Sequence, residues 1–165
     1  GSNDVLQLSS APFQMADDHA VVVGFNGTNV AGNSTLFEVG TGAGTTPRVC
    51  SMRINAGAVN TIWHDGTASL QSAAGTCVAG TPFVMSARKV GNNVRTRNNG
   101  VNGLLLSDPL AATTSTTAFI GNRDTFTFER ANGNISAVVV MKATVSDADL
   151  ALIERFVGSL QGQTL

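Results

Sequence analysis

The sequence predicts an all-β domain, a two-sheet antiparallel jelly-roll sandwich with one short C-terminal helix. Hydrophobic residues make up 42% of the chain and charged residues 13%, which supplies a core and excludes a disordered tail. Apolar residues recur mainly with a period of two, as they do in strands. The 18 glycines, together with Thr, Ser and Asn, fill the gaps between apolar runs and favour turns. At 165 residues, one hydrophobic core is sufficient.

Short apolar or alternating segments define the expected strands. These segments are residues 21–25, 36–39, 48–55, 59–65, 83–90, 94–98, 118–120, 126–128 and 135–142. In 48–55 the even positions, from Arg48 to Ile54, form the expected apolar face and the odd positions the polar face. The turns at 55–57 and 91–93 are short and rich in Gly and Asn, which predicts hairpins.

One C-terminal segment has a helical period. Ser146 is the expected N-cap, followed by acidic residues in the first turn. Three apolar residues at helical spacing are expected to pack on the sandwich: Leu150, Ile153 and Phe156. Gly158 is expected to end the helix.

Charge and cysteine content exclude several partners. The formal net charge is −1 and no basic block exceeds the pair Arg88-Lys89, so no nucleic-acid partner is expected. No apolar run approaches the roughly 20 residues that span a bilayer, so no membrane insertion is expected. Cys50 and Cys77 match no zinc spacing; one disulfide and two buried free thiols both remain open. No cofactor is expected.

The sequence favours a binding protein over an enzyme. Glycoside hydrolysis needs two carboxyl groups facing one sugar bond, whereas Glu38, Glu129 and Glu154 are isolated from one another along the chain. His19 and His64 have no serine elbow near them. No catalytic residue is therefore assigned, and hydrolase activity is the least expected function.

Seven segments carry a resemblance to a known family. They are Leu36–Gly40, Arg48–Ile54, Val84–Gly100, Ala118–Gly121, Gly133–Val140, Val145–Leu150 and the tail Ile153–Leu165. Their order resembles the concanavalin A-like lectin/glucanase superfamily in its laminin-G-like branch, as found in bacteriophage tail and bacterial surface proteins. The resemblance covers residues 5–165, taken as one domain, and leaves 1–4 as an expected tag remnant or linker.

The resemblance implies a non-catalytic carbohydrate-binding module that recognises a receptor on a host surface. The expected partners are a glycan or host-surface polysaccharide and other virion or surface-protein subunits. The expected location is the virion or an extracellular surface. The alternative is a structural virion decoration or oligomerisation module without a small ligand.

Polar and aromatic residues on strands and loops supply the candidate ligand contacts. They are Trp63, Asp65, Arg53, Arg95, Arg97, Asn99, Asn122 and Arg123. Trp63 suits stacking on a sugar ring, with core packing as the alternative. Arg95 and Arg97 share a strand face, and Arg53 could join Arg88; such arginines suit carboxylate-bearing or sulfated sugars, or else form a solvated face.

The segment after residue 120 is the best candidate in the sequence for binding calcium. Asn122 with Asp124 is the best-placed oxygen pair, because calcium prefers such ligands. No clustered acidic loop accompanies the pair, so no metal ligand is assigned.

Overall fold

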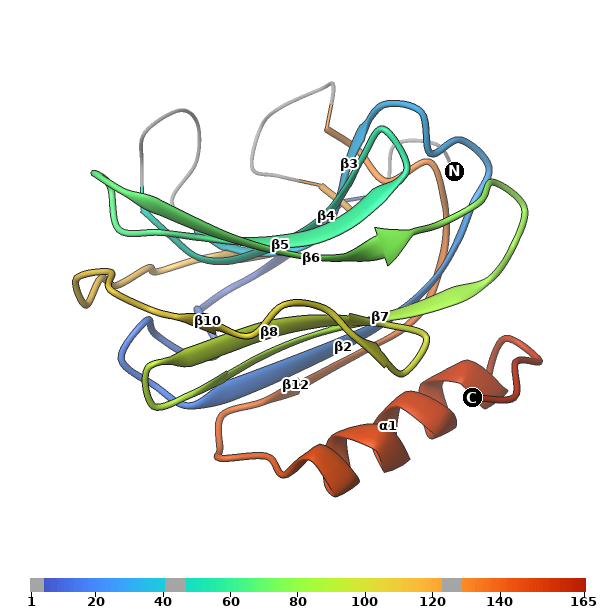
Figure 1. Ribbon diagram of the computed structural model, residues 1–165. Coiled ribbons are helices and arrows are strands. Elements are labelled where there is room, and N and C mark those ends of the chain that lie inside the picture. The colour runs from blue at the N-terminus through green and yellow to red at the C-terminus, as the bar shows by residue number, and fades with distance from the viewer. Residues whose placement is uncertain (1–4, 41–46, 123–128) are drawn as a thin grey trace.

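The computed structural model describes residues 5–40, 47–122 and 129–165. Two antiparallel sheets stack face to face, and a single helix lies beneath one of them (Figure 1). Sheet A has the order β1 (Leu6–Leu8), β11 (Ala118–Ile120), β3 (Asn33–Gly40), β4 (Arg48–Asn55), β5 (Ala58–His64) and β6 (Ser69–Thr76). Sheet B has the order β10 (Leu106–Ser107), β8 (Asn93–Asn98), β7 (Phe83–Val90), β2 (His19–Gly27) and β12 (Gly133–Met141), and β9 (Val101–Asn102) pairs with β8. The predicted jelly-roll sandwich is confirmed.

Four strands escaped the sequence prediction, namely β1, β6, β9 and β10. Three of them span three residues or fewer, and β6 is rich in Ser, Ala and Gly, so none has a strong alternating apolar signal. The expected strand at 126–128 and the expected tag remnant at 1–4 lie outside the described residues. Both predicted hairpins occur, β4–β5 and β7–β8.

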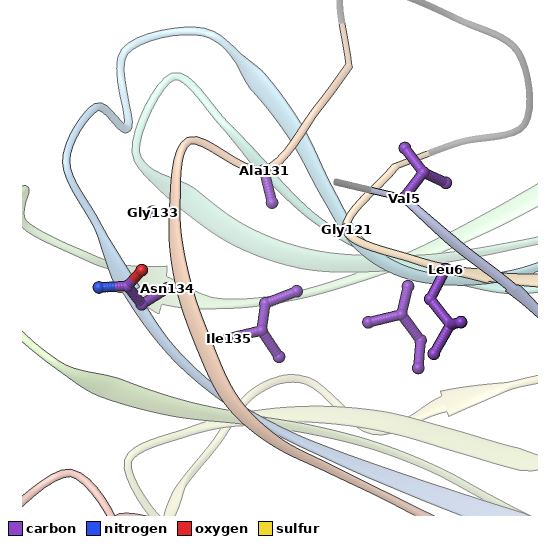
Figure 2. A pocket seen from close by; sticks show the side chains of 8 residues that line it. Val5, Leu6, Gly121, Ala131, Gly133, Asn134 and Ile135 are labelled. Atoms are coloured by element: carbon purple, nitrogen blue, oxygen red, sulfur yellow. The ribbon is translucent and has the colours of Figure 1, made fainter. Parts of the chain in front are cut away.

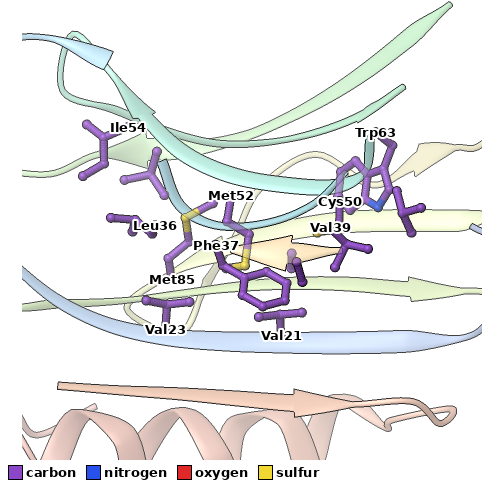
Figure 3. Close-up of a cluster of buried hydrophobic side chains, with 14 of the residues drawn as sticks. Val21, Val23, Leu36, Phe37, Val39, Cys50, Met52, Ile54, Trp63 and Met85 are labelled. Carbon is purple, nitrogen blue, oxygen red and sulfur yellow. The ribbon is translucent and has the colours of Figure 1, made fainter. Parts of the chain in front are cut away.

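The core fills the space between the inner faces of the two sheets (Figure 3). Phe37, Met52 and Trp63 of sheet A meet residues of β2 and β7 there. Phe25 and Phe83 of sheet B pack edge to face, with ring centroids 5.7 Å apart. Cys50 and Cys77 are buried free thiols, which decides between the two alternatives for the cysteines.

A bulge in β4 changes which side chains enter this core. The pairing of β4 with β5 shifts register between Arg48 and Ser51, so Val49 and Cys50 both join the core cluster. Arg48 instead pairs with His64. The prediction that Arg48 lies on the apolar face and Val49 on the polar face is therefore wrong, because strict alternation fails at the bulge.

The helix α1 (Asp147–Ser159) covers the outer face of sheet B (Figure 1). The Ser146 side chain accepts a hydrogen bond from the Asp149 backbone N–H, as predicted for the N-cap. Leu150 is buried in a second cluster with residues of β2 and β7, and Ile153 is half-buried against it. Phe156 is 58% exposed, so its predicted packing is wrong. No helix in the described part of the chain is long and apolar enough to cross a membrane.

Candidate functional site

The outer face of sheet A is the sandwich surface that α1 leaves uncovered (Figure 1). Strand register places one row of side chains across all six strands: Gln7, Phe119, Glu38, Ser51, Ile62 and Gln71. A neighbouring row, here called the Arg53 row, crosses the next position of three strands: Thr35, Arg53 and Asn60. The two rows lie on the same face because directly paired residues point to the same side of a sheet.

The first row is packed tightly around Glu38. The Glu38 carboxylate is fully buried and accepts a hydrogen bond of 2.8 Å from the Ser51 hydroxyl. A Cβ atom added at Gly40 would lie 3.0 Å from the Glu38 Oε1 atom and 3.5 Å from Cγ of Arg48. Because residue 40 is a glycine, the Glu38 and Arg48 side chains can occupy the space beside its backbone.

The Arg53 row is less completely satisfied. The Arg53 guanidinium makes no hydrogen bond or ion pair with any described residue, and its Nε atom is buried. The Asn60 amide donates to the Ala58 carbonyl at 3.1 Å, but its buried Oδ1 atom has no partner, and neither does the buried Thr35 hydroxyl. Buried polar atoms are normally paired, so these three neighbouring exceptions make the Arg53 row the candidate site.

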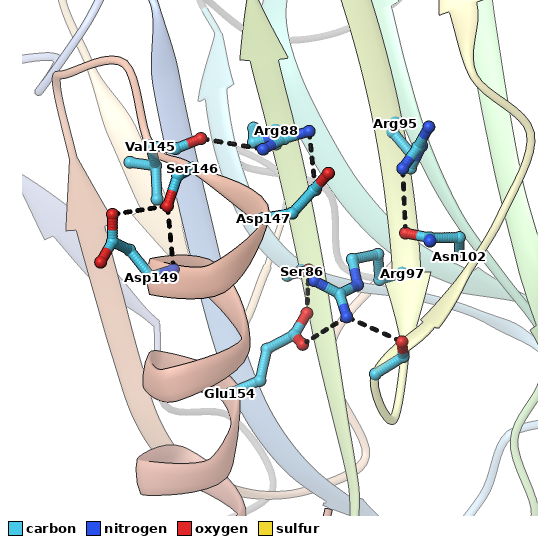
Figure 4. A network of polar contacts seen from close by, with 11 residues as sticks. Ser86, Arg88, Arg95, Arg97, Asn102, Val145, Ser146, Asp147, Asp149 and Glu154 are labelled. Carbon is cyan, nitrogen blue, oxygen red and sulfur yellow. Dashed lines mark hydrogen bonds and ion pairs between the residues drawn. The ribbon is translucent and has the colours of Figure 1, made fainter.

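The outer face of sheet B carries Arg88, Arg95 and Arg97, and Arg88 and Arg97 form contacts with the helix segment there (Figure 4). Arg88 donates to the Val145 carbonyl and pairs with Asp147, each at 2.8 Å. Arg97 pairs with Glu154 of α1 at 3.3 Å. These contacts fasten the helix to β7 and β8.

The Glu154 side chain is the buried acid at the centre of this network. Only 1% of Glu154 is exposed, and the Ser86 hydroxyl donates to its Oε1 atom at 2.6 Å. Burial raises the pKa of the Glu154 carboxyl, although the Ser86 hydrogen bond and the Arg97 charge act in the opposite direction. Arg97 therefore compensates a buried charge.

The predicted arginine arrangement is correct in one part and wrong in another. Arg95 and Arg97 share the outer face of sheet B, as expected from their spacing. Arg88 lies on that same face, directly opposite Arg95, whereas Arg53 belongs to sheet A. The expected grouping of Arg53 with Arg88 is wrong because the two strands belong to different sheets.

The remaining candidate residues do not form one site with these arginines. Trp63 is fully buried in the core, so the core alternative holds and its ring offers no surface for stacking. Asp65 accepts backbone hydrogen bonds from Ala68, Thr67 and Ala111, which lower the pKa of its carboxyl to about 2.

The loop candidates have separate positions. Asn99 has a positive φ of 49° and its side chain accepts a bond of 2.7 Å from the Val84 backbone N–H, so it shapes the β8–β9 turn. Asn122 is buried. Arg123 and Asp124 lie outside the described residues. Within the described ranges, no group of three or more His, Cys, Asp or Glu residues could hold a metal ion.

Sequence reasoning missed Thr35 and Asn60 as neighbours of Arg53. For Asn60 a signal was present, because the predicted hairpin turn at Ala56 and Gly57 places residues 53 and 60 opposite each other. For Thr35 no local signal exists, since β3 and β4 are separated by a longer connection and a bulge.

A pocket of about 490 Å³ lies where the edges of the two sheets diverge (Figure 2). Its apolar side chains come from both layers, with Leu6 and Ile120 on the sheet A side and Ile135 on β12. Gly121 and Gly133 complete its wall, and Asn134 adds an amide. Polar and apolar atoms both contribute to the lining, which contains no described ionisable side chain.

The fold is shared with solved structures of known proteins. The CBM40 of Ruminococcus gnavus IT-sialidase, bound to alpha2,3 sialyllactose, superposes with a TM-score of 0.71 at 15% identity, over 92% of this chain and 97% of that chain. Domains LG4-5 of the mouse laminin alpha1 chain give 0.65 at 10% identity, over 89% and 41%. A botulinum neurotoxin type C structure, whose cell entry depends on two ganglioside molecules, gives 0.63 at 8% identity, over 87% and 36%.

No protein-family model matches the sequence, and no curated protein matches it. At these identities the structural likeness establishes the fold alone. The chain has the concanavalin A-like jelly-roll fold that its sequence resembles.

Proposed function

We propose that this domain is a non-catalytic glycan-binding module that holds an acidic sugar on the outer face of sheet A. The observation that carries the proposal is the Arg53 row, where a guanidinium, an amide oxygen and a hydroxyl lie in register without partners. A guanidinium recognises a carboxylate or sulfate through two parallel hydrogen bonds. Thr35 and Asn60 are buried, so the half-buried Arg53 side chain is the member of the row that would contact the sugar.

The structural neighbours agree with this class of ligand. Two solved complexes of the R. gnavus CBM40 hold sialyllactose, an acidic glycan, on a domain of this fold. The domain of R. gnavus sialidase is a carbohydrate-binding module and not a catalytic domain. These likenesses support glycan binding without catalysis, and we propose the Arg53 row as its location.

The biological setting follows the sequence resemblance. We place the module at an extracellular surface, as part of a bacteriophage tail or bacterial surface protein that recognises a host polysaccharide. Its expected affinity for one sugar unit is weak, about −4 to −8 kcal/mol, because the face offers few contacts around one arginine. Repeated copies would then provide avidity.

Calorimetry with sialyllactose and with neutral lactose tests the proposal. The expected result is binding of the acidic sugar alone, lost in Arg53→Ala and reduced about tenfold or more in Arg53→Lys, which keeps the charge but not the planar fork. Arg95→Ala, on the opposite face, is the matched control and should bind as the parent does.

Three outcomes would contradict the proposal. Binding that survives Arg53→Ala would remove the Arg53 row from the site. Release of reducing sugar from the glycan would show catalysis. Failure to bind any member of an acidic glycan array would favour the alternative, a structural module without a small ligand.

A further inference from the structure

Strand β12 differs from the other long edge strand of the sandwich. It spans nine residues, Gly133–Met141, and pairs with β2 alone, so its second edge carries no strand among the described residues. The eight-residue β6 also ends a sheet, but Gly103 lies so close to the Ala73 carbonyl that a Cβ atom would overlap it. The Ser72 hydroxyl also donates to the Leu104 carbonyl. The edge of β6 is therefore covered, whereas that of β12 is open.

The composition of β12 favours pairing with another strand. It contains no charged residue and no proline, and Val138, Val139 and Val140 form a β-branched run. Natural edge strands normally avoid association through charges, proline, bulges or short length. β12 has one bulge, near Ser136, and beyond it the pairing with β2 is regular through Met141.

The exposed face of α1 carries a second apolar feature on the same side of the molecule. Leu152, Phe156 and Leu160 are 57%, 58% and 53% exposed. Figure 4 shows Asp147 and Glu154 on the flank of α1 that faces β7 and β8, with Asp149 on the opposite flank, toward β12.

Helical spacing places Phe156 on that second flank. Phe156 lies seven residues after Asp149, which is two helical turns, and Leu160 is one further turn along. The apolar flank of the helix and the open edge of β12 are therefore adjacent.

We propose that two copies of this chain associate through β12, joined antiparallel about a two-fold axis perpendicular to sheet B. Such an axis pairs β12 with itself and keeps both α1 helices on the same side of the joined sheet. The Phe156 flank of one helix then faces the Phe156 flank of the other. A symmetric interface requires a self-complementary surface, and an uncharged strand beside a helix flank on which Phe156 and Leu160 follow Asp149 meets this requirement.

A second copy fits better than an unrelated extended peptide. A peptide would pair with the backbone of β12 but would leave the exposed apolar flank of α1 uncovered. The second copy supplies both a strand and an apolar helix flank in the required relation. The joined sheet would contain ten strands, five from the main path of each sheet B.

Sedimentation velocity over a concentration series up to about 100 μM tests the association. The parent chain should form a dimer, and Phe156→Asp should raise the dissociation constant at least about tenfold, because a carboxylate would enter the apolar contact. Leu104→Asp is the matched control, since Leu104 is 69% exposed but belongs to the segment beside β6. This control should dimerise as the parent does.

Hydrogen exchange of the β12 amides tests the strand pairing itself. Exchange across residues 137–141 should be at least about tenfold slower in the dimeric parent than in Phe156→Asp. A melting temperature equal to that of the parent, measured at a concentration at which both are monomeric, would show that the variant is folded, because Phe156 is exposed. The proposal is wrong if the parent is monomeric throughout, if Phe156→Asp remains dimeric, or if β12 exchanges equally in both. Sugar binding at Arg53 is measured separately and does not depend on these outcomes.

Discussion

The outer faces of the two sheets use the same residue types in different ways. On sheet B the arginines Arg88 and Arg97 meet the acids of α1, and the central strands bury Val22 and Val84 beneath the helix. On sheet A no helix covers the face, and Arg53 has no acidic partner in the described chain. Whether an arginine on a strand forms an ion pair therefore depends on which segment packs above it.

The largest expected difference between the faces concerns loss of an arginine. Arg97→Ala should lower the free energy of unfolding by about 3–5 kcal/mol, because it leaves the buried Glu154 carboxylate uncompensated. Arg53→Ala should change it by less than about 0.5 kcal/mol. Denaturant unfolding measures both values. Equal losses would show that Arg53 also holds the fold together.

The apolar part of the sheet B face gives the next effect. Leu150→Ala should cost about 2–5 kcal/mol, since it opens a cavity between α1 and the sheet. The matched substitution is Leu152→Ala on the same helix. It should lower the free energy of unfolding by less than about 0.5 kcal/mol, because Leu152 is exposed. Thermal unfolding of the two variants tests the assignment of the buried face; similar losses would contradict it.

Acid should destabilise the sandwich through a residue that belongs to neither outer face. His19, at the start of β2, is fully buried, stacks on Phe13 at 4.0 Å, and burial lowers its pKa from 6.5 to about 4. The unfolded chain therefore binds a proton below pH 6.5 that the folded chain binds only near pH 4, so stability falls as the pH falls through this range.

The loss of stability in acid follows from the difference between the pKa of His19 in the unfolded and folded chain. Between pH 7 and pH 5 the His19 contribution should be a loss of about 2 kcal/mol. His19→Phe should remove this component of the pH dependence, as measured by unfolding at several pH values. A parent and variant with the same pH profile would mean that His19 does not titrate on unfolding.

A further comparison separates Arg95 from its neighbour Arg97 on the sheet B face. Arg95 is half-buried and its one side-chain hydrogen bond is to Asn102, at 3.1 Å. Arg95→Ala should therefore cost no more than about 0.5–1 kcal/mol, well below the cost of Arg97→Ala. Chemical denaturation compares the two, and a cost like that of Arg97→Ala would show that Arg95 is also part of the helix clamp.

The local sequence determined most of the secondary structure and the class of the fold. Apolar or alternating runs predicted the long strands except β6, the Gly and Asn residues predicted the hairpins, and Ser146 predicted the start of the helix. These signals depend on neighbours in sequence, so they can be recognised without the tertiary structure. The burial of Phe156 could not be predicted in this way, because helical spacing defines an apolar stripe but not how much of the stripe the sheet covers.

Only the tertiary structure decided which polar residues are available to a ligand. The sequence treated Arg53 and Arg97 alike, yet one meets Glu154 across more than fifty residues of chain and the other does not. Trp63 was equally ambiguous until sheet stacking buried it. The Arg48 bulge likewise depends on how β4 pairs with β5. Burial and charge pairing depend on contacts between distant segments. The local sequence of a strand does not show which distant segment will pack against that strand.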